Sequence, residues 1–295
     1  MLCEKNGGVG LTMVEAVGDR ISAFKETRLW TEVRKLKHDL IIRFAKRENR
    51  VYTQFYRFPH QLRALIERIV PALRPHGTGI DAEPLEIFVF ACCSGEEAFS
   101  LSYVLRKHFP ELSYRIRACD IVGDVIEKAK AGIFTQEEAK WGPFVTDEIV
   151  AEMFEPAGEG LLRVKSEIRE PIKFTEGNLL DQQFMDALGQ ADLVFAQNVL
   201  FHMPRPQARE AFRNVHGVLK SGGALFVNGM DADMRADMSK RLGLEPLEYL
   251  IEEIHNDARV DRGGAWAGTY VGRKPFTRSG RDWLRQQGTI FFKSR

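Results

Sequence analysis

Apolar runs alternate with segments of helical spacing through the middle of the chain. The first run, residues 85–91, is continuously apolar, which is typical of a parallel strand buried on both faces. The first two strands are each followed by a turn and a helix, an order that indicates a doubly wound α/β sheet. The predicted strands are residues 85–91, 114–119, 172–175, 191–196, 224–228 and 289–292, and the predicted helices are residues 96–107, 123–131, 207–219 and 237–241.

Helical spacing also precedes the first strand, and an insertion interrupts the later alternation. Apolar residues within 21–44 predict one or two helices, and a further helix opens at Phe58–Pro59 and ends in the turn-rich stretch 71–79. A hairpin is expected about Gly160–Val164, followed by Ile168. The predicted organisation is a helical N-terminal segment of residues 1–75, an α/β domain of residues 76–295, a small β-subdomain at about 134–171 and a C-terminal extension at about 230–295.

The charge of the chain is nearly balanced, at a formal +1, but it is unevenly distributed. Residues 20–50 carry ten Lys and Arg against four Asp and Glu, and residues 259–295 carry nine against two. Basic ends of this kind suit an anionic substrate or nucleic acid, or simply form a solvated face. No RNA-binding motif is visible, so nucleic acid is not the partner we expect, and the sequence leaves the oligomeric state open.

The four cysteines match neither a zinc-binding pattern nor the framework of a secreted disulfide protein. We expect Cys92 and Cys93, which lie in an apolar stretch, to be buried as small hydrophobic residues. The N-terminus lacks the pattern of a signal peptide, and no apolar run approaches the length of a membrane span. These features predict a soluble, cytoplasmic protein, and no metal site is expected.

Two features after the first strands point to a nucleoside-containing cofactor. Ala91, Cys93 and Gly95 stand where a G-x-G-x-G loop has its glycines, between a strand and a helix, although an ordinary turn would also use small residues. Asp120 ends the second strand, where an acidic residue binds ribose hydroxyls in nucleotide-binding domains, although an Asp there can also cap a helix. The two features together favour a ribose-bearing cofactor.

Two asparagines and one glycine-containing stretch separate a methyltransferase from a dehydrogenase. Asn178 and Asn198 follow the third and fourth strands of the predicted parallel sheet, where a polar side chain can meet adenine or an amino-acid moiety. The stretch 219–225, LKSGGAL, before the next strand is typical of methyltransferases. These residues favour S-adenosylmethionine over NAD.

Five ordered motifs resemble those of the CheR-type chemotaxis-receptor glutamate methyltransferases. The resemblance covers about residues 50–228. The matching segments are Thr53–Arg57 for T-x-F-F-R, Cys93–Ser100 for S-T-G-E-E-P-Y-S, Asp120–Val122 for D-I-D, Gly160–Leu180 for the stretch ending in N-L-L, and Gln197–Met203 for R-N-V-L-I-Y-F.

The resemblance implies a Rossmann-like domain with a mostly parallel seven-stranded sheet that binds S-adenosylmethionine and releases S-adenosylhomocysteine. It places Thr53, Arg57 and Glu96 at the methionine end of the cofactor. Asp120 would hold the ribose, Asn178 and Leu179 the adenine, and Asn198 and Val199 would line the cleft near the sulfonium. The full set of implied cofactor-binding residues is Thr53, Arg57, Ala91, Ser94, Gly95, Glu96, Asp120, Ile121, Asn178, Leu179, Asn198 and Val199.

The departures from the family pattern lie on the acceptor side. Gln197 replaces the family's Arg, His202 replaces its Tyr, and Asn228–Asp231 stands in place of H-S-E. The chain also continues beyond the point where the family normally ends, and the aromatic and cationic segment Trp266–Phe276 could close over a substrate. These departures favour a small-molecule methyl acceptor, with methylation of a glutamate in a chemoreceptor protein as the alternative.

Arg57 and His202 are the candidate catalytic residues, and they suit different acceptors. A glutamate acceptor is ionised at neutral pH and needs only a cation, such as Arg57, to orient it. An amine or guanidinium acceptor must lose a proton, for which His202 is the natural base, unless it has only a structural role. An RNA methyltransferase and a non-catalytic module that binds S-adenosylmethionine are two further hypotheses.

Overall fold

The structure is a computed structural model, and its contacts divide the chain into two compact units, residues 1–46 and residues 47–295. In the first unit, the described residues Val33, Leu36 and Leu40 are helical, and the rest of the helix expected there lies outside the described part. The expected lid also lies outside it, apart from Phe276. The residues that the structure describes are 33, 36, 40, 53–74, 83–257 and 276–295.

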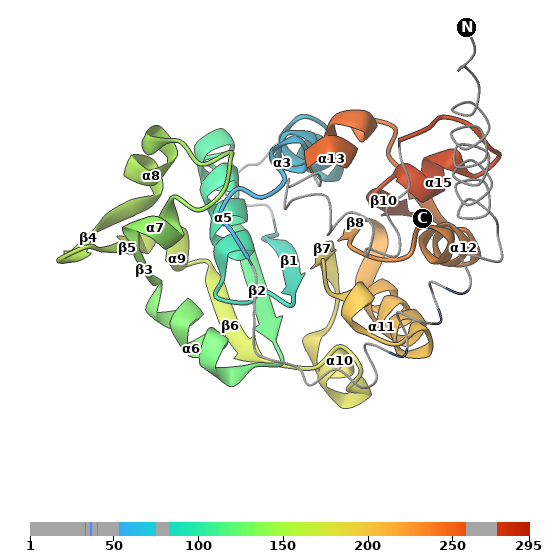
Figure 1. Cartoon of the computed structure of the whole chain (residues 1–295), viewed down its shortest axis with the longest axis horizontal. Helices are drawn as coiled ribbons and strands as arrows, with labels where there is room; N and C mark the ends of the chain where they lie inside the picture. Colours follow the sequence, from blue (N-terminus) through green and yellow to red (C-terminus); the bar gives the residue numbers. More distant parts are fainter. Residues whose placement is uncertain (1–32, 34–35, 37–39, 41–52, 75–82, 258–275) are drawn as a thin grey trace, which may run out of the picture. The chain divides into compact units, whose positions relative to one another are not determined.

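The second unit contains the predicted seven-stranded sheet, in the order β6-β2-β1-β7-β8-β10-β9 (Figure 1). Five strands are parallel, and β10 pairs antiparallel with both β8 and β9. The chain builds outward from β1 to β2 and β6, and then continues on the other side with β7 and β8. The strand order therefore reverses between β1 and β7, and ligands of open α/β sheets bind at such a point. The strands are β1 (Leu85–Phe90), β2 (Tyr114–Asp120), β6 (Ile172–Glu176), β7 (Ala191–Gln197), β8 (Leu219–Asn228), β9 (Leu244–Pro246) and β10 (Ile290–Lys293).

Helices cover both faces of the sheet, as expected for a doubly wound fold. Ile87 and Val89 of β1 belong to a core cluster with α5, whereas Phe88 and Phe90 belong to a second cluster with α11 and α12. This alternation explains why β1 is continuously apolar, since each face is covered. The helices are α5 (Glu96–His108), α6 (Gly123–Ala131), α9 (Ser166–Arg169), α10 (Gln182–Leu188), α11 (Arg205–Gly217), α12 (Ala232–Arg241), α13 (Ile251–Asp257) and α15 (Trp283–Gln287).

The helix before β1 ends at Leu73, within the predicted stretch 71–79, and passes through Pro71. It comprises α3 (Pro59–Ala64), a π-helical turn (Leu65–Ile69) and α4 (Val70–Leu73). Proline lacks an amide hydrogen and clashes with the carbonyl four residues earlier, so a helix that contains Pro71 must adjust its backbone there. The wider π turn, in which the Val70 amide donates to the Leu65 carbonyl, accompanies the continuation through Pro71.

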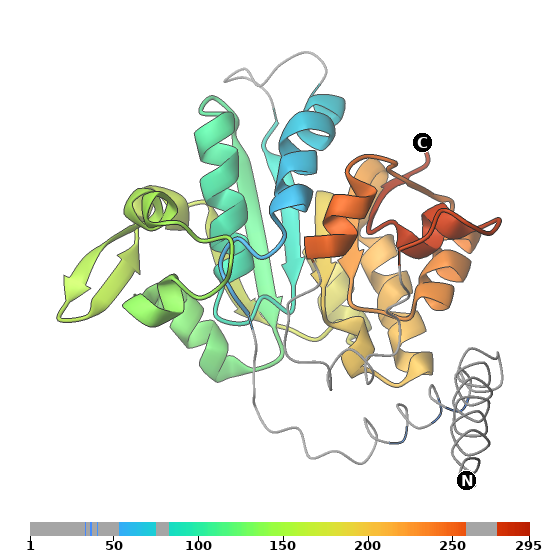
Figure 2. The same ribbon diagram turned by 45° about the horizontal axis from the view of Figure 1, so that its top comes forward.

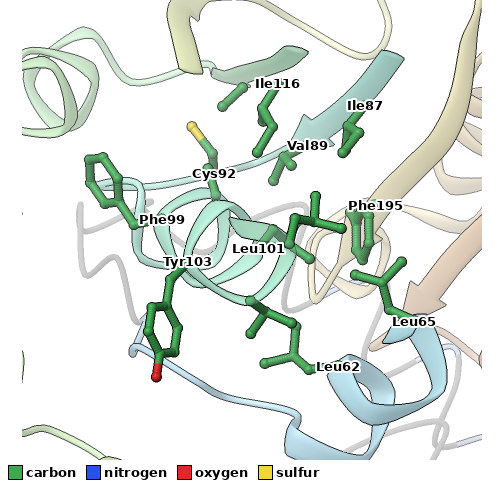
Figure 3. Close-up of a cluster of buried hydrophobic side chains, with 14 of the residues drawn as sticks. Leu62, Leu65, Ile87, Val89, Cys92, Phe99, Leu101, Tyr103, Ile116 and Phe195 are labelled. Atoms are coloured by element: carbon green, nitrogen blue, oxygen red, sulfur yellow. The ribbon is translucent and has the colours of Figure 1, made fainter. Parts of the chain in front are cut away.

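This helix packs beside α5 against the sheet (Figure 2). Figure 3 shows Leu62 and Leu65 facing Leu101 of α5 and Phe195 of β7. The Phe195 ring stacks on Phe226 of β8, with ring centroids 4.3 Å apart. The helix of residues 59–73 is therefore part of the main core of this unit.

The insertion forms a small sheet in the order β3-β5-β4. The predicted hairpin begins earlier than expected, because β4 pairs antiparallel with β5, and Ile168 lies in α9 instead of in a strand. Thr135 and Thr146 cap the two short helices of this subdomain through their side-chain oxygens. Its elements are β3 (Ile133–Thr135), α7 (Gln136–Ala139), α8 (Asp147–Met153), β4 (Phe154–Gly158) and β5 (Leu161–Val164).

Two boundaries near the C-terminal part differ from the prediction. Gly222 and Gly223 were expected to form a turn before a strand, but β8 begins at Leu219 and contains both. The pairing of β8 with β7 shifts at this point, and a Cβ on Gly223 would lie 2.8 Å from the Asp192 carbonyl oxygen, so the glycine permits a bulge. Helix α12 begins earlier than predicted because the Asp231 side chain caps it.

The predicted C-terminal extension contributes β9 and β10, which complete one edge of the main sheet. The predicted closing strand is confirmed as β10, whereas β9, α13 and α15 were not anticipated. Within the described part of the chain, no helix is both long and apolar enough to cross a membrane.

Candidate active site

The loop after β1 has an unusual backbone conformation at the three positions singled out from the sequence. Ala91, Cys93 and Gly95 have φ values of 55°, 54° and 93°, all in the left-handed region. That region favours glycine, so the loop keeps the backbone of a G-x-G-x-G turn with only one glycine. A Cβ on Gly95 would lie 2.8 Å from the Phe99 ring and 2.9 Å from the Phe174 ring. The third position therefore requires glycine for space as well as for conformation.

The Asp120 carboxylate holds this loop against β2. Its Oδ2 accepts a hydrogen bond from the Cys93 amide at 2.9 Å, and its Oδ1 accepts one from the Val122 amide at 3.1 Å. Asp120 does not cap α6, which has no side-chain cap, so the helix-cap alternative is not what the structure shows. Each carboxylate oxygen keeps a lone pair for a ribose hydroxyl. The next residue, Ile121, is 50% exposed and offers an apolar surface beside it.

Glu96, the first residue of α5, is a buried carboxyl group with one unused oxygen. Its Oε1 accepts a hydrogen bond from the buried Ser94 hydroxyl at 2.7 Å, whereas its Oε2 is buried without a partner among the described residues. Burial raises the pKa of Glu96 to about 7. Burial also raises the pKa of Glu97 to about 7, although the nearby Arg57 charge lowers it. An added cation would find an acceptor at Glu96 Oε2.

The segment from Thr53 to Arg57 is fixed to α5 and to the small sheet. The Phe55 ring is buried against Phe134 and Phe154, with centroids 5.0 Å away in each case. The Tyr56 amide donates to Ser100 Oγ at 2.9 Å, and that hydroxyl donates to the Glu96 carbonyl at 2.6 Å. The half-buried Thr53 and Arg57 are thereby held near the start of α5.

The end of β6 adjoins Asp120. The Gly177 amide donates to the Asp120 carbonyl at 2.9 Å. Asn178 and Leu179, the predicted adenine-binding residues, therefore follow directly after a residue that is hydrogen-bonded to the end of β2. Asn178 is half-buried, and its side-chain oxygen accepts from the Leu180 amide at 2.9 Å. Leu179 is buried, and its carbonyl accepts from Asn214 Nδ2 at 2.8 Å.

The end of β7 carries a second left-handed turn, at Asn198. Asn198 has a φ of 53°, and its amide donates to the Asn228 carbonyl at 2.9 Å. A Cβ on Gly229 would lie 2.6 Å from the Asn198 Cα, so the two strand ends approach closely. The Nδ2 of Asn198 is buried without a partner among the described residues, and Val199 beside it is half-buried.

Two departures from the family pattern, one at the last position of β7 and one shortly after the strand, have different surroundings. His202 is exposed in a 3₁₀ turn, and its ring lies 3.9 Å from the Phe201 ring centroid. Gln197 is buried, and its side chain binds Gln61 of α3. Gln61 was not anticipated as a site-bordering residue, because no local pattern links residues 136 positions apart.

The three described cysteines are free thiols and are buried, as expected for Cys92 and Cys93. Burial raises the pKa of Cys93 and of Cys119 to about 12, and raises that of Cys92 still further. These groups are therefore protonated at neutral pH and unsuited to act as nucleophiles.

The strand order, the left-handed loop and the carboxylate at the end of β2 define a Rossmann-like S-adenosylmethionine-dependent methyltransferase domain. Residues 51–243 match the model of the family described as "CheR methyltransferase, SAM binding domain". The chain belongs to the CheR methyltransferase family, and S-adenosylmethionine is the cofactor of this domain.

Curated relatives include proteins from two genera. The chain is 29% identical over 186 residues to chemotaxis protein methyltransferase 2 of Vibrio cholerae, which covers 62% of each chain. It is 31% identical over 186 residues to chemotaxis protein methyltransferase 1 of Pseudomonas aeruginosa, covering 61% of this chain and 65% of the relative. It is 26% identical over 213 residues to the probable biofilm formation methyltransferase WspC of that organism, covering 71% and 48%. The chain thus spans less than two thirds of the length of these relatives.

The side chains present fit the cofactor. The unused Oε2 of Glu96 can accept from a methionyl ammonium group, and the spare lone pairs of Asp120 can accept from ribose hydroxyls. The backbone of the loop at Ala91 and Cys93 has the conformation that allows close approach of a ligand.

Proposed function

We propose that this protein transfers the methyl group of S-adenosylmethionine to a carboxylate of a protein, as a chemoreceptor glutamate methyltransferase does. The relatives named chemotaxis protein methyltransferase support this acceptor, and they outweigh the sequence departures that favoured a small molecule. Those departures are Gln197, His202, residues 228–231 and the C-terminal extension, whereas the family match extends over residues 51–243.

Within this proposal, the chain's own residues bind and orient the two reactants. S-adenosylmethionine supplies a methyl group that is already activated by its sulfonium. Glu96 pairs with the ammonium group of the cofactor, Asp120 binds its ribose, and Asn178 with Leu179 borders its adenine. Most of the catalytic effect then comes from alignment, because the displacement at carbon needs no protein nucleophile.

Arg57, at the methionine end of the cofactor in this proposal, is also the residue that we assign to orient the acceptor carboxylate. Its guanidinium lies in the same region as Glu97, whose pKa it lowers. A guanidinium presents a planar set of donors that matches a carboxylate. Because a glutamate is already ionised near neutral pH, this acceptor requires no general base, and His202 has no proton to remove.

The observation that carries the proposal is the left-handed loop bound to the Asp120 carboxylate, at the switch point of a CheR-family sheet. The test is incubation with methyl-labelled S-adenosylmethionine and cytoplasmic fragments of several chemoreceptors. We expect label in the receptor that is released as methanol by mild base, which identifies a methyl ester. At a limiting cofactor concentration, Asp120→Ala should sharply reduce the label, whereas Asp124→Ala, a change at an exposed acid at the start of α6, should retain it. Base-stable label, or no label on any receptor, would contradict the proposed acceptor.

A further inference from the structure

Three buried polar side chains form a continuous chain of hydrogen bonds beside the site. Gln197 Nε2 donates to Gln61 Oε1, and Gln61 Nε2 donates to Thr289 Oγ1 at 2.8 Å. All three residues are at most 7% exposed. We call Gln197, Gln61 and Thr289 the amide relay. Gln197 Oε1 is buried without a partner among the described residues, whereas the other two members each keep a hydrogen bond. Buried amides are costly to leave unpaired, so loss of either of these two hydrogen bonds is unfavourable.

Each member of the relay adjoins a segment that borders the proposed site. Gln197 is followed directly by Asn198, which lies at the end of β7. Gln61 lies in the first turn of α3, shortly after Arg57. The Thr289 carbonyl accepts from the Val227 amide at 2.8 Å, so Thr289 is fixed to the end of β8. The relay therefore joins the Arg57 segment to the two strand ends on the acceptor side.

A second connection reaches the same turn of α3 from the C-terminal part of the chain. The buried Asp257 carboxylate accepts from the His60 amide at 2.9 Å and contacts His60 Nδ1 at 2.7 Å. Helix α3 has no side-chain cap of its own, so Asp257 satisfies one of its initial amides from a distant segment. His60 and Gln61 are thus held, side by side, by residues that come about 200 positions later.

We propose that the amide relay is a positioning device, and that Gln197, Gln61 and Thr289 set where Arg57 lies relative to the cofactor. This inference rests on the proposed cofactor-binding role of Arg57. Gln197 stands where related sequences have an arginine, and a glutamine both donates and accepts, so it can end a buried relay without a charge. Displacements of about 1 Å at such sites have large effects on binding and catalysis.

The test is calorimetric binding of S-adenosylhomocysteine to four full-length proteins: wild type, Arg57→Ala, Thr289→Val and the double variant. Thr289→Val keeps the shape of the side chain and removes the hydroxyl. We expect it to weaken binding about fivefold, the effect of one hydrogen bond, when Arg57 is present. In the Arg57→Ala background, Thr289→Val should change affinity by less than about twofold, because Thr289 affects binding only by positioning Arg57.

Thr289→Ser, which retains the hydroxyl, is the matched control and should bind as wild type does. Gln61→Met breaks the relay at its middle and should give the same dependence on Arg57, should Thr289→Val fail to fold. The proposal would be overturned if the affinity losses of Arg57→Ala and Thr289→Val multiplied in the double variant. It would also be overturned if Thr289→Val and Gln61→Met both bound with wild-type affinity. Because binding needs no acceptor, a failed receptor-methylation assay counts only against the proposed function. Absence of binding by the wild type would contradict both.

Discussion

Glu96 is a carboxyl group whose protonation should change when the cofactor binds. Burial raises its pKa to about 7, so in the empty site much of it is protonated near neutral pH. Pairing with an ammonium favours the ionised form and lowers the pKa again. Binding must therefore release a proton in the pH range between the bound and the free pKa values, and affinity must rise as the pH increases toward about 7.

We predict proton release when S-adenosylmethionine binds at pH 6.5. It would be measured as a difference in calorimetric heat between buffers of different ionisation enthalpy. Glu96→Gln should abolish most of this release. Glu97→Gln is the matched control, because Glu97 has a similarly raised pKa but faces Arg57, and it should leave the release from Glu96 in place. Equal heats in all buffers for the wild type would contradict the role of Glu96.

His202 distinguishes the two kinds of acceptor that the sequence left open. A carboxylate acceptor needs no base, so His202→Ala should change kcat on a receptor fragment by less than about threefold. Phe201→Leu, at the ring that lies beside His202, controls for disturbance of the turn. A loss of about a hundredfold or more, with unchanged cofactor affinity, would indicate general-base catalysis and an acceptor that carries a proton.

At the scale of elements, the loop after β1 combines two demands on Gly95. A side chain there would have to adopt the left-handed conformation and would also collide with Phe99 and Phe174. Gly160 shares only the first demand, since its φ is +70° and nothing lies near its would-be Cβ. Comparing a substitution at Gly95 with one at Gly160 therefore distinguishes the cost of backbone strain from the cost of steric overlap.

We predict that Gly160→Ala lowers the free energy of unfolding by about 1 kcal/mol, the usual cost of a left-handed alanine. Gly95→Ala should cost about 1–3 kcal/mol more, because a buried methyl is forced against two rings. Urea denaturation of both variants measures these values. Similar losses for the two variants would show that the rings beside Gly95 give way.

Elements with a strong local pattern were predicted well, and those shaped by distant contacts were not. The apolar run of β1 and the amphipathic spacing of α5 are local, and both were found as predicted. The π turn in the helix before β1, which packs against α5, was not predicted, and neither was the β8 bulge beside Asp192 of another strand. Neither the π turn nor the bulge can be recognised from the residues next to it in the sequence.

At the scale of the whole second unit, the mostly parallel seven-stranded sheet and the cofactor were predicted from the sequence, whereas the acceptor was not. Asp120 and the small residues at 91–95 are visible in the sequence, and the fold joins them through the hydrogen bond from the Cys93 amide to Asp120. Gln197, by contrast, was noticed only as a departure, and its partners Gln61 and Thr289 come from remote segments. The preference for a small-molecule acceptor rested on such departures, and the family relationship does not support it.

The measurement that tests the central claim most directly is calorimetric titration with S-adenosylmethionine and S-adenosylhomocysteine. The proteins compared are wild type, Asp120→Ala and Asp124→Ala. We expect saturable binding of both ligands by the wild type. Asp120→Ala should weaken it by about 1.5–3 kcal/mol, since a charged acceptor of hydrogen bonds is lost, and Asp124→Ala should have little effect. No binding by the wild type, or equal affinity in the Asp120→Ala protein, would contradict the site described here.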